Sequence, residues 1–351
     1  MDEASEYIRP LERLSRSDEP TFGGKSANLG ELLAADIPVP PGFAISTAAF
    51  RAFVNDAGLE DRINGALAGL SVGDVEAIGR ASRAIGEAMR FAPIPESVRG
   101  QIAEHYVKLG GADTPVAVRS SAVGEDSQDA TFAGQQETYL WVRGVEHVCD
   151  AVRDCWVSLY SAPAISYRLR LGATGEPPAM GVTVQLMVDA DVSGVMFTCN
   201  PVSGDPSMVA INASWGLGLA VVGGEVTPDD YLVSKVTREV VREHVHDKDV
   251  QYVPDAGGSG AVRAAVPDER RAVRCLDQPA IERLVEIARR IERYFASHQD
   301  IEWAVPRGDP DHVFIVQTRP VTAVANKPSK PKPESAMSLI MSTFGAGPRA
   351  N

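Results

Sequence analysis

Hydrophobic positions in the first hundred residues recur mainly at helical spacing. Residues 21–36 place three leucines on one side of a helix that follows a glycine-containing turn. Ser46 stands where an N-cap residue would begin the next helix. Two more helical patterns fill residues 73–109, and the proline-containing segment 92–97 separates them. The pattern therefore predicts a mainly helical first part of the chain.

From residue 116 onward, short runs of alternating polar and apolar residues predominate, and such runs predict strands. A helical stretch at 145–171, which Pro163 interrupts, and an amphipathic helix at 278–298 lie between them. We see no internal repeat. The predicted strand regions are 116–142 (two strands around a polar loop), 180–188, 193–200, 208–216, 229–246, 300–305 and 312–321.

The composition is that of an ordinary globular protein of 351 residues, with 44% apolar and 23% charged residues. No apolar run reaches the length needed to span a bilayer, and the acidic start lacks the apolar segment of a secretory signal. A net charge of −13 argues against nonspecific binding to nucleic acid. We therefore expect a cytoplasmic protein that binds neither membrane nor nucleic acid.

The cysteine and histidine residues give no sign of a metal centre. The four cysteines include no Cys-x-x-Cys pair, and no cysteines and histidines stand together at zinc-binding spacing. We expect small buried thiols. The six histidines are scattered along the chain, and we expect structural or surface roles for most of them.

Two cationic side chains stand where a helix and a strand can present them to a polyphosphate. Lys25 lies in GGKSANLG at the start of a predicted helix, and Arg119 lies near the end of a predicted strand. ATP carries about four negative charges, which proteins offset with Lys, Arg, backbone N–H groups and Mg²⁺. The spacing excludes a P-loop, because the leading glycine of GxxxxGK[ST] is missing.

The segment ATFAGQQ, which follows Arg119, has the small residues of a loop that covers phosphates. Gly134 permits close approach of the backbone, and Thr131 offers a hydroxyl group. We therefore predict that a fixed guanidinium and a phosphate-covering loop lie together.

Two metal-binding candidates lie on neighbouring predicted strands near the end of the strand-rich part. Glu302 in DIEWAV and Gln317 in FIVQTRPV can point to one face, and Arg319 reaches the same face because strand side chains alternate. One carboxylate and one amide oxygen suit Mg²⁺, which keeps water and phosphate oxygens as further ligands. Each residue alone is more often a surface or core-edge residue. Together with Lys25 and Arg119, they predict a site for a nucleoside triphosphate and Mg²⁺.

Six blocks of the sequence resemble a known family. They are GGKSANLGELL, VAVRSSAVGEDSQDATFAGQQETYL, CWVSLYSAPAISYRLRLG, GVTVQLMVDADVSGVMFTCNPVSG, DIEWAV and VQTRP. In this order they are similar to the N-terminal ATP-binding module of the phosphoenolpyruvate synthase and pyruvate phosphate dikinase family, to which rifampicin phosphotransferase also belongs. The resemblance covers residues 10–324, and six ordered blocks are far more specific than one motif.

The resemblance implies an α+β fold of the ATP-grasp type, in which two subdomains with mixed or antiparallel sheets and flanking helices clasp ATP. Residues 1–115 would form the mainly helical part of subdomain 1, and 116–200 the phosphate loop, helices and start of the nucleotide sheet. Residues 201–324 would form subdomain 2 with the metal-binding strands, and 325–351 a linker or tail. The Pro- and Lys-rich composition of the tail favours an unstructured segment over one that docks on a partner.

The family motifs also imply roles for particular residues. Lys25, Arg119 and Arg319 would hold phosphates and act in catalysis, and Glu302 and Gln317 would hold Mg²⁺ or Mn²⁺. Without the surrounding blocks, Met187 would be taken as an ordinary core residue. The other implied ATP contacts are Thr131, Gly134, Gln135 and Thr138 in the loop over the phosphates, and Gln185, Leu186, Met187 and Val188 in a hinge whose backbone meets adenine.

Two positions depart from the family pattern. Asn212 stands where family members commonly carry an acidic residue, and the segment GLGL carries Leu219 where GLGE is common. Because two carboxylates near the nucleotide are lost, the family pattern does not decide how the ribose is contacted or whether a second metal ion binds. Because the lysine, arginine and metal positions are intact, we expect ATP binding to persist.

The family chemistry requires a histidine that this sequence does not supply. Family members pass the β-phosphoryl group of ATP to a histidine in a glycine-rich turn and release AMP and phosphate. None of the six histidines resembles that turn. We therefore expect a separate subunit that carries the histidine and the acceptor site. This arrangement resembles phenylphosphate synthase, which phosphorylates phenol or 4-alkylphenols such as 4-cresol.

Other functions stay open at this point. The acceptor could be pyruvate, as in a divided phosphoenolpyruvate synthase, or an antibiotic, as in rifampicin phosphotransferase. The chain could also be a nucleotide-sensing subunit without turnover, or a piece of a longer enzyme. The acceptor consumed and the nucleotide released, AMP or ADP, distinguish these alternatives.

Overall fold

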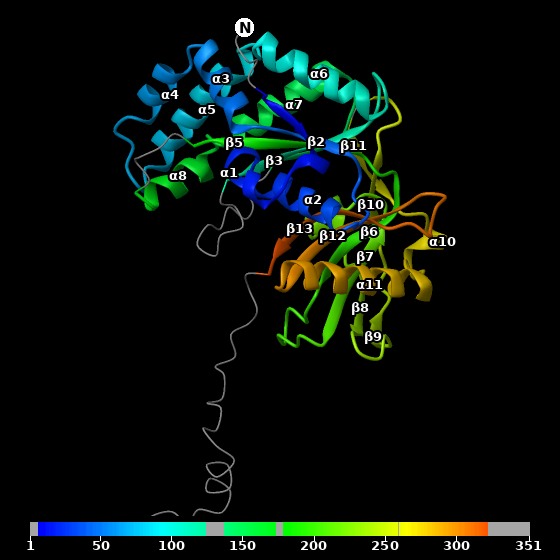
Figure 1. The fold of residues 1–351 in the computed structure, drawn as a ribbon. Coiled ribbons are helices and arrows are strands. Elements are labelled where there is room, and N and C mark those ends of the chain that lie inside the picture. The colour runs from blue at the N-terminus through cyan, green and yellow to red at the C-terminus, as the bar shows by residue number, and fades with distance from the viewer. Residues whose placement is uncertain (1–5, 124–136, 173–177, 259, 322–351) are drawn as a thin grey trace, which may run out of the picture.

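The computed structural model describes residues 6–123, 137–172, 178–258 and 260–321. Within these ranges the chain forms a five-stranded sheet, a six-stranded sheet and a separate two-stranded sheet, with helices packed on the two larger ones (Figure 1). All pairs between the described strands are antiparallel. The predicted mixture of helices with antiparallel sheets is confirmed.

The five-stranded sheet has the strand order β1-β2-β5-β3-β4. Helices α3 to α8 lie on one face of it, whereas α1 and α2 lie on the other (Figure 1). Short 3₁₀ turns at Leu11–Arg13 and Arg16–Asp18 precede α1. The strands are β1 (Ile8–Pro10), β2 (Gly42–Ile45), β3 (Val116–Ala122), β4 (Thr138–Val142) and β5 (Met180–Leu186). The helices are α1 (Glu19–Phe22), α2 (Gly24–Ala34), α3 (Thr47–Asp56), α4 (Glu60–Leu67), α5 (Val75–Phe91), α6 (Glu96–Gly110), α7 (Val145–Ser158) and α8 (Ala162–Arg170).

The six-stranded sheet has the strand order β13-β12-β6-β7-β8-β9, and α11 covers one of its faces (Figure 1). The amphipathic helix predicted at 278–298 is confirmed, although it ends at Phe295 because Ala296 takes a left-handed conformation. The strands are β6 (Ala190–Phe197), β7 (Met208–Trp215), β8 (Asp229–Ser234), β9 (Val240–His244), β12 (Gln299–Pro306) and β13 (Phe314–Pro320). The helices are α9 (Leu219–Val222), α10 (Asp268–Arg271) and α11 (Gln278–Phe295).

A hairpin of β10 (Val250–Pro254) and β11 (Ala261–Ala265) connects the two halves. In the middle of β10 the carbonyl of Tyr252 accepts a hydrogen bond from the N–H of Leu217 at 2.9 Å, and at the hairpin tip the N–H of Gly260 donates to the carbonyl of Trp141, in β4, at 3.0 Å. The sequence gives no sign of this connection.

The chain leaves the first sheet after β5 and enters the second at β6. The change of sheet therefore comes before residue 201, where the change of subdomain was expected. Strand β6 pairs with β7, the next strand, and with β12, a strand distant in sequence, and local patterns do not reveal the second pairing.

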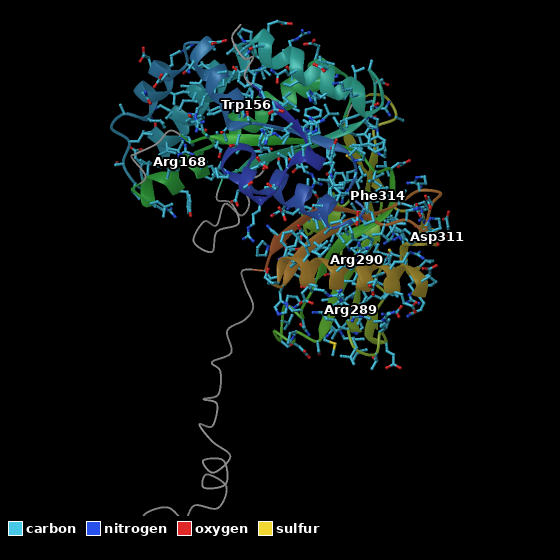
Figure 2. The ribbon with its side chains drawn as sticks, viewed as in Figure 1. Trp156, Arg168, Arg289, Arg290, Asp311 and Phe314 are labelled. Atoms are coloured by element: carbon cyan, nitrogen blue, oxygen red, sulfur yellow. The ribbon has the colours of Figure 1, made fainter. Side chains whose placement is uncertain are left out.

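Helix α2 lies at the junction of the two halves. Gly23, with φ +81°, precedes it, and a Cβ atom at this position would lie 2.0 Å from the carbonyl oxygen of Ser121 in β3. Only glycine allows so close an approach of α2 to the strand. At the other end of α2, Arg290 on α11 donates to the carbonyls of Ala35 and Asp36 at 3.1 and 3.0 Å (Figure 2). The helix is therefore fixed to both halves.

Two large apolar clusters stabilise the molecule: one lies in the first half, and the other joins the second sheet and α11 to α2 and the segments around it. In the first half, Trp156 on α7 is fully buried and stacks on Phe53 with ring centroids 5.1 Å apart (Figure 2). Cys149 and Cys155 lie in the same core, and burial raises the pKa of Cys149 to about 11 and that of Cys155 still further. These thiols are inert core residues, as the sequence predicts.

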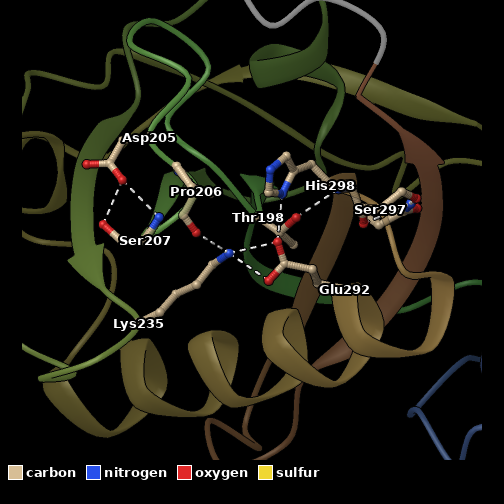
Figure 3. Close-up of polar contacts among 9 residues, drawn as sticks. Thr198, Asp205, Pro206, Ser207, Lys235, Glu292, Ser297 and His298 are labelled. Atoms are coloured by element: carbon tan, nitrogen blue, oxygen red, sulfur yellow. Dashed lines mark hydrogen bonds and ion pairs between the residues drawn. The ribbon is translucent and has the colours of Figure 1, made fainter. Parts of the chain in front are cut away.

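A polar cluster closes one end of the second sheet. Figure 3 shows Lys235 after β8, whose Nζ lies 2.8 and 2.6 Å from the two carboxylate oxygens of Glu292 on α11. His298 Nδ1 lies 2.7 Å from Oε1 of the same carboxylate, and Lys235 also donates to the carbonyl of Pro206. The cluster ties α11 to the loop between β6 and β7.

Candidate functional site

A cavity of about 640 Å³ lies between the two sheets. Strands β3, β4 and β5 line it from the first sheet, β6, β12 and β13 line it from the second, and α9 and β10 complete it. Segments far apart in the sequence therefore meet there. The residues predicted from the sequence that line it are Arg119, Thr138, Gln185, Leu186, Met187, Val188, Glu302, Gln317 and Arg319.

One end of the cavity is polar, and β12 and β13 supply most of its side chains. Glu302 lies opposite Gln317, and Asp300 lies opposite Arg319. The intervening residue of β12, Ile301, belongs to the core under α11. Because side chains alternate along a strand, the four polar residues share the face that points away from that helix.

A β-bulge lies next to Glu302. Glu302 pairs with Gln317, but Trp303 pairs with Ile315, so Val316 has no opposite residue in the β12–β13 ladder. The carbonyl of Val316 accepts a hydrogen bond from Nη1 of Arg119 at 3.0 Å. The residue without an opposite partner thus binds the guanidinium through its backbone oxygen.

Arg119 reaches from β3 to the polar residues of the second sheet. Its Nη1 lies 3.4 Å from Oε1 of Gln317 and 3.5 Å from Oε2 of Glu302. The side chain is 11% exposed, and its buried Nε has no hydrogen-bond partner among the described residues. An unsatisfied buried donor is unfavourable unless a ligand accepts from it. Arg119 therefore offers the cavity both a positive charge and a spare donor.

Asp300 lies beside the polar end, next to Arg319, although it is not among the described residues that line the cavity and was not predicted from the sequence. Its Oδ2 accepts a hydrogen bond from Nε of Arg319 at 2.8 Å. Burial raises the pKa of the Asp300 carboxyl, and the charge of Arg319 offsets this only in part. The alternation that selects Glu302 applies equally to Asp300, two residues earlier, so the signal was present in the sequence.

The other end of the cavity is apolar, and the hinge after β5 forms one of its walls. The N–H of Leu186 donates to the carbonyl of Pro41 at 2.8 Å, and the N–H of Met187 donates to that of Pro115 at 3.0 Å. These bonds fix the hinge backbone between two loops. The side chains that cluster there are Leu140, Met187, Val188, Leu217, Tyr252 and Val316.

Lys25 is not among the described residues that line the cavity. Its side chain is 6% exposed, and its Nζ donates to the carbonyl of Ser120 at 2.9 Å. The start of α2 is held against β3, where the N–H of Ser26 also donates to Oγ of Ser121 at 3.2 Å. Lys25 thus lies beside the strand that carries Arg119, and its role in phosphate binding stays a prediction.

Thr131, Gly134 and Gln135, which were predicted to cover phosphates, lie outside the described residues. Of the two departures from the family pattern, Leu219 lines the cavity, whereas Asn212 lies in β7 opposite Val195 and Asp230. Of the two positions that depart from the family pattern, only Leu219 is therefore among the described residues that line the cavity.

Two further findings concern the described ranges alone. They contain no group of three His, Cys, Asp or Glu side chains that could hold a metal ion. They also contain no helix that is long and apolar enough to cross a membrane.

Comparison with known proteins identifies a family. A family model described as pyruvate phosphate dikinase, AMP/ATP-binding domain, matches residues 19–339. The chain belongs to this family. The probable phosphoenolpyruvate synthase of Methanothermobacter thermautotrophicus is 39% identical over 351 residues, which cover 99% of this chain and 50% of that protein.

Two further members of the family with similar sequences are phosphoenolpyruvate synthases. The protein of Aeropyrum pernix is 37% identical and matches 93% of this chain and 44% of its own length. That of Pyrococcus furiosus is 35% identical and matches 98% of this chain and 47% of its own length. The chain thus spans half or less of these curated relatives. The family inferred from the six sequence blocks is confirmed, whereas the narrower resemblance to phenylphosphate synthase gains no support from these relatives.

Proposed function

We propose that this chain is the ATP-cleaving module of a phosphotransferase of the phosphoenolpyruvate synthase type, and that its two sheets form an ATP-grasp fold. ATP lies in the cavity of about 640 Å³, with adenine at the apolar end and the phosphates at the polar end. One observation carries the proposal: Arg119 from the first sheet comes within 3.5 Å of Glu302 and Gln317 from the second.

Adenine suits the apolar end. Met187 and Leu217 belong to the apolar cluster there, and such side chains pack well against a flat ring. The N–H groups of Leu186 and Met187 are bonded to Pro41 and Pro115. The ring therefore pairs with the N–H of Val188, the next residue of the hinge.

The phosphates suit the polar end. Arg119 has a buried Nε that can donate to a phosphate oxygen, and Arg319 adds a second positive charge at the same face. Thr138 lies opposite Arg119 in the pair of β3 with β4, so its hydroxyl is close to the same phosphates. In phosphoryl transfer, such groups position the reactants and offset the charge that spreads over the phosphate oxygens.

Glu302 and Gln317 would hold Mg²⁺ or Mn²⁺. Their Oε2 and Oε1 atoms approach the same nitrogen of Arg119, so they converge on a point where a cation is already favourable. Carboxylate and amide oxygens are ligands that Mg²⁺ prefers. The bound ion would supply positive charge to the phosphate oxygens. Arg119, displaced from these two side chains, would then bind phosphate.

Lys25 and the segment that contains Thr131, Gly134 and Gln135 complete the proposed phosphate site. The Nζ of Lys25 donates to the carbonyl of Ser120 at 2.9 Å, which holds it beside the strand that carries Arg119. Its contribution to phosphate binding is assigned to the nucleotide-bound state. The loop assignment depends on the sequence blocks alone.

Pyruvate is our proposed acceptor for the complete system, in place of the phenol that the sequence analysis favoured. The relatives that support the assignment are named phosphoenolpyruvate synthases. In this proposal the β-phosphoryl group of ATP passes to a histidine on a further domain or a separate subunit, and water takes up the γ-phosphoryl group, so that AMP and phosphate are released. The phosphohistidine then transfers the group to pyruvate.

Calorimetric titration with MgATP tests the site. Arg119→Met and Glu302→Gln should each weaken binding by roughly tenfold or more, because each removes a charged interaction. Glu286→Gln is a matched control, since Glu286 is an exposed, ion-paired glutamate on α11 outside the described cavity lining. Wild-type affinity in Arg119→Met would reject the site.

The reaction is tested by adding the histidine-bearing remainder of a phosphoenolpyruvate synthase and either pyruvate or phenol. The expected products are AMP, phosphate and phosphoenolpyruvate. ADP as the sole nucleotide product would contradict transfer through histidine. Formation of phenyl phosphate without phosphoenolpyruvate would favour phenol as the acceptor instead.

A further inference from the structure

The described lining of the cavity contains three acidic residues, Glu137, Glu225 and Glu302. Two of them lie at the polar end. Glu302 is the proposed metal ligand, and Glu137 directly precedes Thr138, which pairs with Arg119. Glu225 lies at the opposite side, where its Oε1 accepts a hydrogen bond from the hydroxyl of Tyr252 at 2.9 Å. Tyr252 packs against the apolar cluster around the hinge. Glu225 is therefore the acid beside the apolar end.

The backbone fixes the position of Glu225. Helix α9 ends with two hydrogen bonds typical of a Schellman motif: Glu225 N–H donates to the carbonyl of Ala220 at 2.9 Å, and Gly224 N–H donates to that of Val221 at 3.2 Å. Gly224 has φ +67°, the left-handed conformation that this motif requires. Glu225 therefore occupies a defined position directly after the helix.

The hairpin fixes the orientation of the Glu225 carboxylate. Tyr252 on β10 and Arg263 on β11 lie directly opposite each other in the hairpin. The tyrosine hydroxyl binds Oε1, and Nε of Arg263 lies 3.4 Å from Oε2. A carboxylate has about four acceptor positions, so two partners leave others available. Such a group is oriented and still able to accept hydrogen bonds from a ligand.

We propose that Glu225 binds the hydroxyl groups of the ribose and makes the cavity selective for ribonucleotides over deoxyribonucleotides. This inference depends on the proposed function, because it assumes that ATP occupies the cavity. A sugar between adenine and the phosphates has two neighbouring hydroxyls, and a carboxylate can accept from both. Leu219, on the same short helix, lines the cavity but offers no acceptor.

Hydrogen bonds from a ligand to a charged group have effects large enough to measure. Loss of one such bond corresponds to a tenfold or greater loss of affinity. We therefore expect wild-type protein to bind ATP at least tenfold more tightly than 2′-deoxyATP or 3′-deoxyATP. The ratio of the affinities, not the affinity itself, reports the contact, because a general loss of packing would weaken all three nucleotides alike.

The experiment is calorimetric titration of the whole chain with ATP, 2′-deoxyATP and 3′-deoxyATP in Mg²⁺. In Glu225→Ala, ATP should bind as weakly as the deoxy analogues, so that the ratio falls to about one. In Tyr252→Phe, the carboxylate remains but loses its orienting donor, and the ratio should lie between these values. Glu286→Gln, the exposed glutamate control, should keep the wild-type ratio.

Three results would overturn the inference. A wild-type ratio near one would show that the ribose hydroxyls are not bound. A ratio of tenfold or more that persists in Glu225→Ala would show that another group binds them. If Glu225→Ala does not fold, a wild-type ratio of ATP to deoxyATP affinity in Tyr252→Phe would likewise show that another group binds the ribose hydroxyls. No ATP binding by the wild-type chain would instead reject the proposed function, and this inference with it.

Discussion

The buried ion pair between Lys248 and Asp229 allows a quantitative test of the fold. Both side chains are fully buried, and Nζ of Lys248 lies 2.6 Å from Oδ1 of Asp229. The carboxylate also accepts hydrogen bonds from the backbone N–H groups of His246 at 3.0 Å and Cys275 at 2.8 Å. Asp229 thus connects β8 to two later segments. Among the described residues, Lys248 is the only cation that forms an ion pair with Asp229.

The expected effect of Lys248→Met follows from these contacts. Removal of one partner of a buried ion pair leaves an uncompensated charge and costs about 3–5 kcal/mol. The two backbone donors to Asp229 remain in the variant and partly stabilise its charge. We therefore expect the free energy of unfolding to fall by about 3 kcal/mol, the lower end of that range. The double variant Asp229→Asn with Lys248→Met removes both charges and should lose less than Lys248→Met alone.

Urea unfolding followed by circular dichroism measures these differences. Lys108→Met is the control, because the ion pair of Lys108 with Glu104 is exposed, with 64% and 60% of the two side chains accessible. Such an exposed pair contributes little to stability, because water screens it. The reasoning is refuted if the free energy of unfolding of Lys248→Met lies within about 1 kcal/mol of the wild-type value, which is well below the loss expected for a buried pair. It is also refuted if the double variant is less stable than Lys248→Met.

Three further substitutions give distinct outcomes. Gly23→Ala places a Cβ atom 2.0 Å from the carbonyl oxygen of Ser121 and should lower the unfolding free energy by more than about 2 kcal/mol in a urea titration. Burial alone would raise the pKa of Asp18, but hydrogen bonds from Ser15 and the charge of Arg9 hold it below its ordinary value. Asp18→Asn should therefore be less stable by about 1 kcal/mol above pH 4, and thermal melts should show this gap closing as the pH falls through the lowered pKa. Burial raises the pKa of Asp300 despite Arg319, so the folded state binds this proton more tightly than the unfolded state. Wild type should lose stability relative to Asp300→Asn as the pH rises above the ordinary aspartate value of about 3.9, and a flat difference between pH 4 and 7 would contradict this.

The sequence predicted the secondary structure well because most elements have strong local signals. The helix at Gln278–Phe295 has an unmistakable apolar stripe, and the break before α8 follows from Pro163. The alternation in DIEWAV and FIVQTRPV placed Glu302 and Gln317 on one face, and the structure pairs them directly. These features depend on neighbours within a few residues, which a sequence displays openly.

Features that depend on distant contacts were not predictable in the same way. The burial of Lys25 follows from the close approach of α2 to β3, and nothing within the segment GGKSANLG indicates which strand it meets. Likewise, Glu225 and Tyr252 become neighbours only because the β10–β11 hairpin returns to the end of α9. The site roles inferred from the family motifs stay predictions until ligand binding is measured.

The bulge beside Glu302 shows why pattern and pairing must be considered together. Strict alternation from Gln317 would assign Val316 to the opposite face from the cavity, yet Val316 lines it and its carbonyl binds Arg119 at 3.0 Å. The single extra residue in β13 resolves this conflict, because it shifts the register on one side of Glu302 while Gln317 keeps its partner. At the bulge, one strand therefore presents a metal-ligand candidate and, at the adjacent residue, a backbone acceptor for Arg119.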